Sequence, residues 1–446
     1  MDSIRPRILI IGAGWAGFIL SQQLNDTKFD ITIVAPHQTF AYTPLLASAA
    51  TGLFFSRLAE EPIRRACRHI SYYRALATAV DFTQKTVTCI PSVLQPSGRD
   101  VPDTEHPFQV EYDILIIAPG CVNQTFNTPG AAEHCFFLKT VPDAEAIKAK
   151  LLSLLEVASL PTTTPERAKE LLHIAVVGGC LKQWDVSCSH IELMICSQGG
   201  GPTGVELSAE LTDLFSEVSK TYPHLAGLPS ITIHDVAPEI LGVFHEKLKV
   251  HALKTFKKHG VEVKTNSHIT KIDEGALYTK EDGKIPVGMV AWATGNKQCD
   301  FVESLHGVSK ATRLDRILTD QRLRVLKDDQ TVLENVYALG DAADIFGKGL
   351  PTTAEVAVQK AEYLVKALNF FSAKPAGPFI YKQRRMVAYV GGTDGVIMGR
   401  QDWTGEAAWL AWRSGSLGWT RSWRRKGMIL ASWAWNLIGG REIARK

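Results

Sequence analysis

Two glycine-rich turns are the parts of this chain whose residue types and spacing most directly indicate chemistry. The first is Gly12-Ala-Gly14-Trp-Ala-Gly17, directly after the apolar run 8–11, and the second is Gly199-Gly-Gly201-Pro-Thr-Gly204. Both have the Gly-x-Gly-x-x-Gly spacing, which lets the backbone approach a pyrophosphate at the N-terminus of a helix. One such turn alone could be an ordinary loop. A pair in one chain predicts one site for a flavin dinucleotide and one for a nicotinamide dinucleotide.

Two aspartates follow strands at positions where a dinucleotide site needs a carboxylate. Asp235 ends the expected strand 230–235, where it can accept both hydroxyls of a ribose and would repel a 2′-phosphate, which favours NADH over NADPH. Asp341 follows Gly340, whose backbone permits close approach, and can reach the polar middle of a flavin dinucleotide. The alternatives are a strand-end turn residue for Asp235 and a helix cap for Asp341.

The elements that must position these residues form two βαβ units. They are a strand, a helix and a strand over 8–11, 17–24 and 30–34, and again over 173–179, 204–219 and 230–235. Further strands over 112–120, 287–295 and 336–341 end in small-residue turns, which contain Gly120 and Thr294-Gly295. The sequence therefore predicts an α/β fold with two Rossmann-type dinucleotide-binding domains. The strand 30–34 lacks an acidic residue at its end, so flavin ribose contacts must come from elsewhere.

The composition bounds the class of protein. At 446 residues, 45% hydrophobic and 21% charged, the chain suits a globular protein of two or three domains. The net charge of +3 gives no argument for nucleic-acid binding. The eight cysteines include no Cys-x-x-Cys pair, so we expect neither a metal site nor a dithiol redox centre. Because the expected first strand begins at residue 8, we expect no cleavable presequence, and no apolar run is long enough to predict a spanning helix.

The C-terminal region is rich in tryptophan. Seven of the ten tryptophans follow residue 400, and arginines alternate with them. Trp and Arg suit the membrane interface, where rings lie among headgroups and guanidinium groups pair with phosphate. The pattern predicts short amphipathic helices and peripheral membrane association through residues 403–438. A Trp-rich dimer interface or a core-packing tail is the alternative.

At this point the chain resembles the type II NADH dehydrogenases, the single-chain NADH:quinone oxidoreductases of fungal, plant and bacterial membranes, and looks fungal-like. The resemblance runs over nearly the whole length. It is carried by the segments 42–46, 61–63, 137–139, 201–206, 292–297, 338–341 and 351–363.

The resemblance implies roles for specific residues. FAD is expected at Gly12, Gly14, Gly17, Thr43, Pro44, Gly120, Gly340 and Asp341. NADH is expected at Gly201, Gly204, Glu206, Asp235, Thr294 and Gly295, with Glu206 near the nicotinamide carboxamide. A quinone site is expected at Ala354, Glu355 and Gln359, where this chain has Ala-Glu in place of the family's common Ala-Gln. The implied activity is transfer of two electrons from NADH through the flavin to a ubiquinone-like quinone without proton pumping, and no acid–base catalyst is expected.

The expected domains follow from this assignment. They are an FAD-binding domain in two parts, 1–165 and 301–385, an NADH-binding domain, 166–300, and a membrane-anchoring region, 386–446. By analogy we expect a peripheral location at the mitochondrial inner membrane, and the cytoplasmic face or another membrane stays open because no presequence is visible. The sequence leaves the oligomeric state open, with a homodimer as one alternative. Rival functions are a soluble apoptosis-inducing-factor-like NAD(P)H oxidoreductase and a non-catalytic FAD-binding membrane protein.

One segment departs from the family. Residues 180–200 separate the strand 173–177 from Gly201-Pro-Thr-Gly204, and deleting them would restore an unbroken phosphate turn. We hypothesise that the segment is a translated intron or a gene-model error, which the transcript would decide. If the segment is real, either His173–Val177 stays in the sheet and the insertion loops out, or Ile191–Ile195 replaces it. In both cases NADH affinity is the property most at risk.

Overall fold

The computed structural model describes residues 5–94, 100–178, 202–242, 244–312, 314–370 and 377–441. The chain forms two compact units, and each combines segments that are distant in sequence. The first unit comprises 1–40, 61–122 and 296–383, and the second comprises 41–60, 123–295 and 384–446. These boundaries differ from the predicted domain ranges at 41–60 and 123–165, which we expected in the FAD-binding domain, and at 386–446, which we expected as a separate region. The segment 123–165 joins the second unit because β11 (Cys135–Phe137) pairs with a strand of that unit, β18 (Met289–Trp292).

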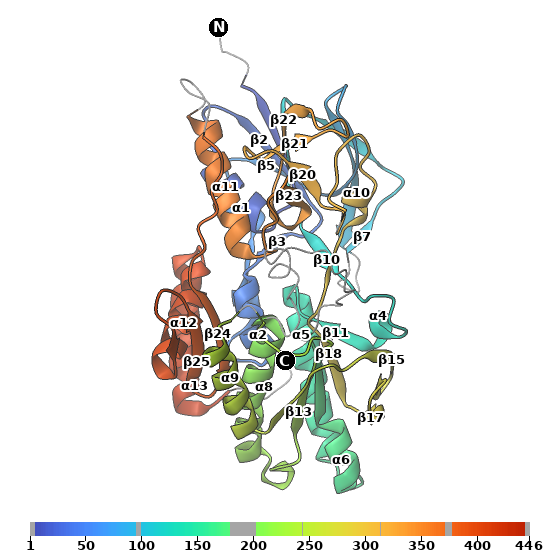
Figure 1. Ribbon diagram of the computed structural model, residues 1–446, viewed down its shortest axis with the longest axis vertical. Coiled ribbons are helices and arrows are strands. Elements are labelled where there is room, and N and C mark those ends of the chain that lie inside the picture. Colours follow the sequence, from blue (N-terminus) through green and yellow to red (C-terminus); the bar gives the residue numbers. More distant parts are fainter. Residues whose placement is uncertain are drawn as a thin grey trace. The chain divides into compact units, whose positions relative to one another are not determined.

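A large mixed sheet organises the first unit (Figure 1). Its order is β23-β20-β21-β22-β9-β1-β2-β5-β6-β7, and β8 pairs with β6. The strands are β1 (Arg7–Ile11), β2 (Asp30–Ala35), β5 (Ser71–Asp81), β6 (Thr86–Leu94), β7 (Asp100–Pro102), β8 (Phe108–Glu111), β9 (Ile114–Ile117), β20 (Ile317–Thr319), β21 (Arg324–Leu326), β22 (Val332–Ala338) and β23 (Ala343–Ile345). The helices are α1 (Trp15–Gln23), α3 (Ile63–Ala66), α10 (Asp300–Glu303) and α11 (Ala354–Asn369).

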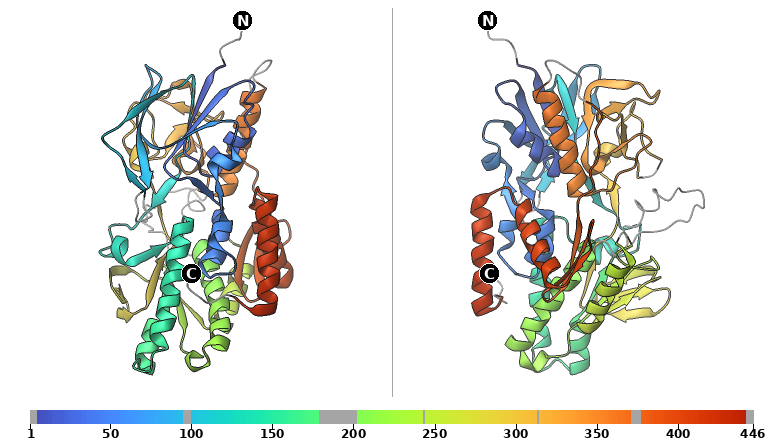
Figure 2. Two further views of the ribbon diagram at one scale, coloured as in Figure 1. Left: turned by 180° about the vertical axis from the view of Figure 1, so that it is seen from behind. Right: turned by 60° about the vertical axis from the view of Figure 1, so that its left-hand side comes forward.

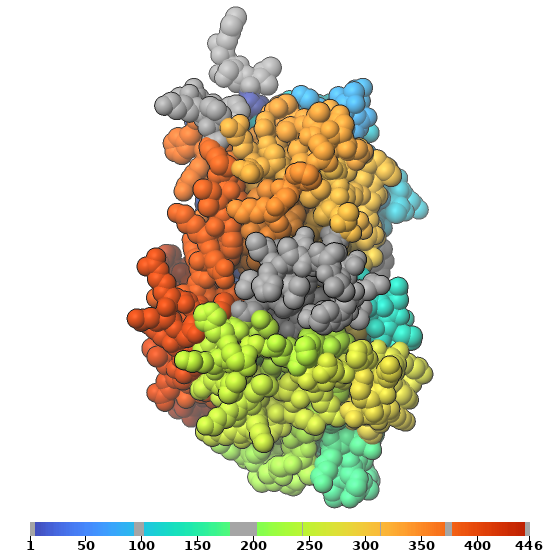
Figure 3. Space-filling view, in the orientation of Figure 1, coloured from blue at the N-terminus to red at the C-terminus, as the bar shows by residue number. Residues whose placement is uncertain are grey.

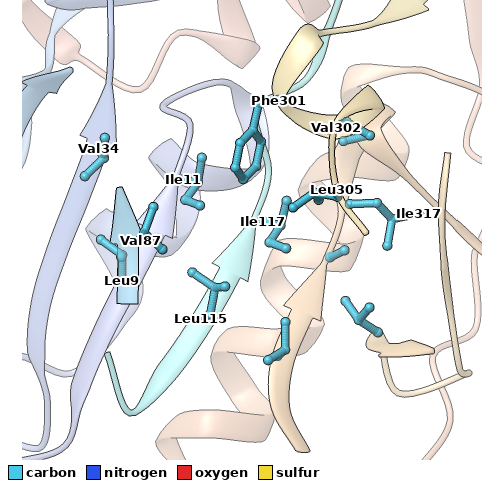
Figure 4. Packing of buried hydrophobic residues seen from close by; sticks show 14 of the residues in the cluster. Leu9, Ile11, Val34, Val87, Leu115, Ile117, Phe301, Val302, Leu305 and Ile317 are labelled. Carbon is cyan, nitrogen blue, oxygen red and sulfur yellow. The ribbon is translucent and has the colours of Figure 1, made fainter. Parts of the chain in front are cut away.

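The centre of this sheet is parallel and buried. β1 pairs with β2 in the register Ile10↔Ile33 and with β9 in the register Leu9↔Leu115. A strand covered on both faces has to be continuously apolar, which explains the run of Ile and Leu in β1. One face packs into the cluster of Figure 4, which includes Val87, Leu305 and Ile317. In Figure 2, α1 and α11 lie side by side.

The second unit has a parallel sheet in the order β11-β18-β12-β13-β14. The strands not yet given are β12 (His173–Val177), β13 (Ser230–His234) and β14 (Val261–Lys264). The helices are α2 (Leu46–Ala50), α4 (Ala131–His134), α5 (Val141–Ala158), α6 (Pro165–Leu171), α8 (Pro202–Thr221) and α9 (Glu246–Lys258). A capping box between Thr140 and Asp143 fixes the start of α5. A three-stranded sheet, β15 (Ile269–Asp273), β16 (Ala276–Thr279) and β17 (Gly283–Pro286), follows.

The C-terminal segment belongs to the second unit. It consists of the sheet β24 (Met386–Gly391), β25 (Asp394–Met398) and β26 (Trp403–Thr404), and of α12 (Glu406–Trp419) and α13 (Trp423–Gly439). In the space-filling view this red segment adjoins the light-green α9, with which β24 and β25 are in contact (Figure 3).

The remaining described strands form two short pairs outside this segment, β3 (Thr39–Ala41) with β4 (Glu60–Pro62), and β10 (Cys121–Asn123) with β19 (Asn296–Gln298). Across the described ranges, every helix falls short of the length and apolar character that crossing a bilayer requires.

The strand before the insertion keeps its place. β12 lies between β18 and β13, in the registers Val177↔Trp292 and Val177↔His234. This agrees with the alternative in which His173–Val177 stays in the sheet. Residues 179–201, which include Gly201 and Ile191–Ile195, lie outside the described residues.

Candidate active site: two dinucleotide-binding turns

The first glycine turn joins β1 to α1, and its three glycines meet different surroundings. Gly12 has φ +99°, and a Cβ atom there would lie 2.2 Å from the Ala118 carbonyl oxygen. A Cβ atom on Gly17 would lie 1.9 Å from the carbonyl oxygen of Gly12. A Cβ atom on Gly14 would meet nothing within 4 Å. The outer glycines therefore allow the strand–turn–helix packing, while Gly14 borders free space, which is the arrangement that a bound pyrophosphate needs.

The Gly340-Asp341 turn lies beside this helix start. Gly340 has φ +76°, and a Cβ atom there would lie 3.8 Å from the Ala16 side chain. The Cys121 thiol donates a hydrogen bond to Asp341 Oδ2 at 3.2 Å. Arg316 Nε donates to the Asp341 backbone oxygen at 3.3 Å. The first unit thus brings together Gly12, Gly14, Gly17, Gly120, Gly340 and Asp341, whereas Thr43 and Pro44 belong to the 3-10 turn η1 (Thr43–Leu45) of the second unit.

A buried lysine beneath this turn escaped the sequence analysis. Lys360 in α11 is fully buried, and its Nζ donates to the Ala343 backbone oxygen at 3.2 Å. Burial lowers the pKa of Lys360 to about 8, and the nearby Arg316 cation adds to the effect. The signal was present in the sequence, because position 360 falls on the apolar stripe of α11 with Val356, Ala357 and Leu364.

The candidate quinone residues begin α11, which Thr353 caps through its side chain. Gln359 Nε2 donates to Glu355 Oε1 at 2.5 Å and to the Lys382 backbone oxygen at 2.9 Å, and Gln359 Oε1 accepts from the Lys382 N–H at 3.1 Å. The structure therefore joins Glu355 and Gln359 in one polar group and leaves Ala354 half-buried beside them. The amide nitrogen and the amide oxygen of Gln359 are therefore both engaged with the chain itself.

In the second unit, Asp235 follows β13 and is buried. Its Oδ1 accepts a hydrogen bond from the Ala237 N–H at 2.8 Å, while Oδ2 is buried without a partner among the described residues. Burial raises the pKa of Asp235 to about 7. A buried carboxylate oxygen without a donor is costly, and two ribose hydroxyls would supply donors. The residue therefore fits the ribose of a dinucleotide.

Three more residues of the predicted NADH set lie at the same carboxyl edge of this sheet. A Cβ atom on Gly204 would lie 3.5 Å from the Ala293 and Val176 side chains, which is ordinary contact between helix and strand. The Thr294 hydroxyl is buried without a partner among the described residues. Gly295 has φ +74°, and a Cβ atom there would lie 2.7 Å from Phe126 Cζ.

Glu206 lies in the first turns of α8 and has an unexpected partner. The indole N–H of Trp412 donates to Glu206 Oε1 at 2.8 Å. Burial raises the pKa of Glu206 to about 8, although the hydrogen bond from Trp412 opposes the shift. The sequence places Trp412 in the predicted membrane-associated region, and nothing in the local pattern pairs position 412 with position 206.

The fold and these sites define a class of protein. In each unit a helix follows a parallel strand, α1 after β1 and α8 after β12, and an aspartate follows another strand of the same sheet, Asp341 after β22 and Asp235 after β13. The described cysteines, Cys67, Cys89, Cys121, Cys135 and Cys299, are all free. The class is an oxidoreductase with two dinucleotide sites.

Comparison with known proteins identifies the family. Residues 6–361 match the pyridine nucleotide-disulphide oxidoreductase family. A probable NADH dehydrogenase of Dictyostelium discoideum is 31% identical, over 98% of this chain and 91% of the relative. An internal alternative NAD(P)H-ubiquinone oxidoreductase of Solanum tuberosum, described as mitochondrial, is 30% identical, over 99% of this chain and 88% of the relative. NDH2 of Plasmodium falciparum, solved in complex with NADH, has the same fold with a TM-score of 0.84 at 23% identity, over 99% of this chain and 100% of NDH2.

The chain belongs to the pyridine nucleotide-disulphide oxidoreductase family and, within it, to the type II NADH dehydrogenases. The predicted fold class, family and enzyme class are therefore confirmed. The fungal-like character and the individual site residues stay predictions.

Proposed function

We infer that this chain transfers two electrons from NADH to a ubiquinone-like quinone through bound FAD, without pumping protons. The family supports the reaction, since its relatives are named NADH dehydrogenase and NAD(P)H-ubiquinone oxidoreductase. Bound FAD supplies the redox chemistry, and the protein supplies binding, orientation and electrostatics. This reaction requires no nucleophile from the residues of the chain.

The residues of the first unit fit FAD. Gly14 leaves space for the pyrophosphate, and the N-terminus of α1 directs backbone N–H groups toward it. Asp341, held by the Cys121 thiol and by its own backbone contacts, provides a carboxylate for the ribityl region. Thr43, Pro44 and Gly120 complete the predicted FAD set, and Ala354, Glu355 and Gln359 stay the predicted quinone set.

The observation that carries the proposal is the Oδ2 atom of buried Asp235, which has no hydrogen-bond partner among the residues that the structure describes. As a carboxylate it accepts hydrogen bonds from both ribose hydroxyls of NADH, and it repels the 2′-phosphate of NADPH. Gly204, Thr294 and Gly295 line the same sheet edge, and Gly201 completes the predicted set. These features support NADH as the electron donor.

The test is a stopped-flow experiment without oxygen on the purified yellow protein. We expect NADH to bleach the flavin absorbance near 450 nm, which is the usual flavin band, NADPH to do so far more slowly, and a short-chain ubiquinone to restore the colour. A flavin that NADH leaves oxidised would overturn the proposal and support the non-catalytic alternative. Bleaching that no quinone reverses would reassign the acceptor.

We further propose that α13 attaches the protein to a membrane surface. Of its 17 residues only Ile429 is buried, while Trp423 is 84% exposed, Leu437 89% and Ile438 88%. Arg424, exposed, and Lys426, whose Nζ lies 4.7 Å from the centroid of the Trp423 ring, add positive charge to the same helix. An exposed apolar stripe flanked by cations suits anionic headgroups over a hydrocarbon layer.

Flotation with vesicles of mixed zwitterionic and anionic phospholipid tests the attachment. We expect the intact chain to float, and the double variant Leu437→Ser/Ile438→Ser to bind at least about tenfold more weakly, because each buried aliphatic side chain contributes roughly 1.5–3 kcal/mol. Leu160→Ser is the matched control, since Leu160 is 51% exposed but outside α13. Equal flotation of all three proteins would exclude α13 as the attachment. We propose the mitochondrial inner membrane as the location because relatives are described as mitochondrial.

A homodimer stays a prediction.

A further inference from the structure

Helix α8 carries four carboxylates on one face. Glu206, Glu210, Asp213 and Glu217 are spaced by four, three and four residues, which places them in one row along the helix. The row faces the C-terminal segment, because α8 packs against β24. Ionised carboxylates at this spacing repel one another, so the ionised members of the row need a compensating cation.

Arg441, the last described residue, provides that cation. Its side chain is 3% exposed, and Nη2 lies 3.2 Å from Glu210 Oε2 and 3.5 Å from Asp213 Oδ2. Nε lies 3.3 Å from Glu217 Oε1, and the Arg441 backbone N–H donates to Glu217 Oε2 at 2.7 Å. Gly440 has φ +74°, a conformation that lets the chain turn away after α13 and lead into Arg441.

The same cluster ties the end of the chain to α2. Arg441 Nη1 donates to Thr51 Oγ1 at 2.8 Å. Glu210, which is fully buried, accepts a hydrogen bond from the Ser48 hydroxyl at 2.6 Å. Three elements from distant parts of the sequence therefore meet at one guanidinium group.

A chain of contacts leads from this cluster to Glu206. Tyr389 donates its hydroxyl hydrogen bond to Asp213 Oδ2, and the Gly392 N–H donates to Asp213 Oδ1 at 2.8 Å. The Tyr389 ring stacks on Trp412, with 4.6 Å between centroids and 17° between planes. The indole N–H of Trp412 then donates to Glu206 at 2.8 Å.

We propose that Arg441 is a positioning residue, which clamps the C-terminal segment onto α8 and thereby holds Trp412 against Glu206. The contact between Arg441 and α8 does not depend on what the protein does. Its effect on NADH binding rests on the proposed function. One buried cation that serves three carboxylates is strongly coupled to them, because removing it leaves uncompensated buried charge. The membrane-facing end of the chain is thus linked to the nicotinamide-facing start of α8.

The test compares Arg441→Gln with Arg441→Lys and with Arg400→Gln, an exposed arginine of the same segment. All are prepared as the full flavin-loaded chain. Hydrogen exchange followed by mass spectrometry measures how firmly Arg441 holds the C-terminal segment, as the exchange rate of its backbone amides. We expect faster exchange in α12 and α13 of Arg441→Gln, partial protection in Arg441→Lys, and wild-type exchange in Arg400→Gln. The double variant Arg441→Gln/Glu210→Gln should regain part of the protection, because it removes one uncompensated charge.

The second measurement is the reduction of the flavin by NADH in the absence of oxygen, which gives the NADH dissociation constant. We expect the NADH dissociation constant of Arg441→Gln to rise about fivefold or more, the usual size of coupling between linked sites, with flavin content unchanged. Wild-type exchange in Arg441→Gln overturns the clamp. Faster exchange with an unchanged dissociation constant overturns the positioning role. If NADH fails to bleach even the wild-type flavin, the proposed function fails, and the exchange data still decide the clamp. If Arg441→Gln does not fold, hydrogen exchange and the NADH dissociation constant are measured on Arg441→Lys and Glu217→Gln instead.

Discussion

The two dinucleotide sites of this protein are built in contrasting ways. The first site is closed by local backbone packing, in which Gly12 and Gly17 fit against Ala118 and against each other. In the second unit, the residue proposed for the nicotinamide depends on a distant segment, since Glu206 of α8 accepts its hydrogen bond from Trp412 of α12. A turn motif is enough to specify a site when the site is shaped by the backbone alone. Where side chains from several elements meet, the motif shows only where the site begins.

The largest effect should come from adding one methyl group to the first turn. Gly17→Ala places a Cβ atom 1.9 Å from the Gly12 carbonyl oxygen, so the turn cannot close without moving β1 or α1. We expect a loss of several kcal/mol in the free energy of unfolding, in the range of severe core defects. Thermal and denaturant unfolding of the purified variant measure it.

Gly14→Ala is the matched control for this change. Its Cβ atom meets nothing within 4 Å, so the unliganded fold should keep its stability within about 1 kcal/mol. The added methyl occupies the space assigned to the pyrophosphate, so FAD should dissociate more readily on dilution. A Gly14→Ala protein that holds FAD as tightly as the wild type would show that the first turn does not cradle the cofactor.

An intermediate effect is expected in the second site from Asp235→Asn. The amide keeps the shape but cannot accept hydrogen bonds from both ribose hydroxyls, so NADH affinity should fall by about tenfold to a hundredfold, for about 1–3 kcal/mol. The wild-type affinity should also weaken as the pH falls below about 7, where the raised pKa of Asp235 brings protonation. The variant should lack this pH dependence. Titration of flavin bleaching between pH 6 and 8.5 measures both, and a wild-type affinity that is flat with pH would argue against Asp235 at the ribose.

The sequence was sufficient to place the first glycine turn after its strand and to place Asp235 and Thr294 after theirs. Glycine spacing after an apolar strand has a direct steric cause, so the positions of Gly12, Gly14 and Gly17 in the turn could be predicted. The contacts of Trp412, Lys360 and Arg441 could not. Each depends on the packing of elements that are distant in sequence, and an indole or a buried cation carries no local pattern that identifies its partner. The composition of the C-terminal segment indicated contact with a membrane surface. It did not indicate that Trp412 and Arg441 of this segment pack against α8.

The smallest effect should come from Trp412→Phe, which tests how far the tail supports the second site. The folded-state pKa of Glu206, about 8, lies above its ordinary 4.5, so the folded state retains a proton that the unfolded state releases. Stability from this group is therefore complete at low pH and is lost as the pH rises through this window. The Trp412 hydrogen bond stabilises the ionised carboxylate and so limits that loss. Loss of packing lowers the stability of the variant at every pH, and without the hydrogen bond the deficit should be larger by about 1 kcal/mol near pH 9 than near pH 6. Trp409→Phe is the control on the same helix, because the buried indole N–H of Trp409 has no partner among the described residues. Unfolding free energies at both pH values decide the matter. If the two variants lose stability in parallel at all pH values, the hydrogen bond to Glu206 contributes nothing specific, and the second site is as independent of the tail as the first.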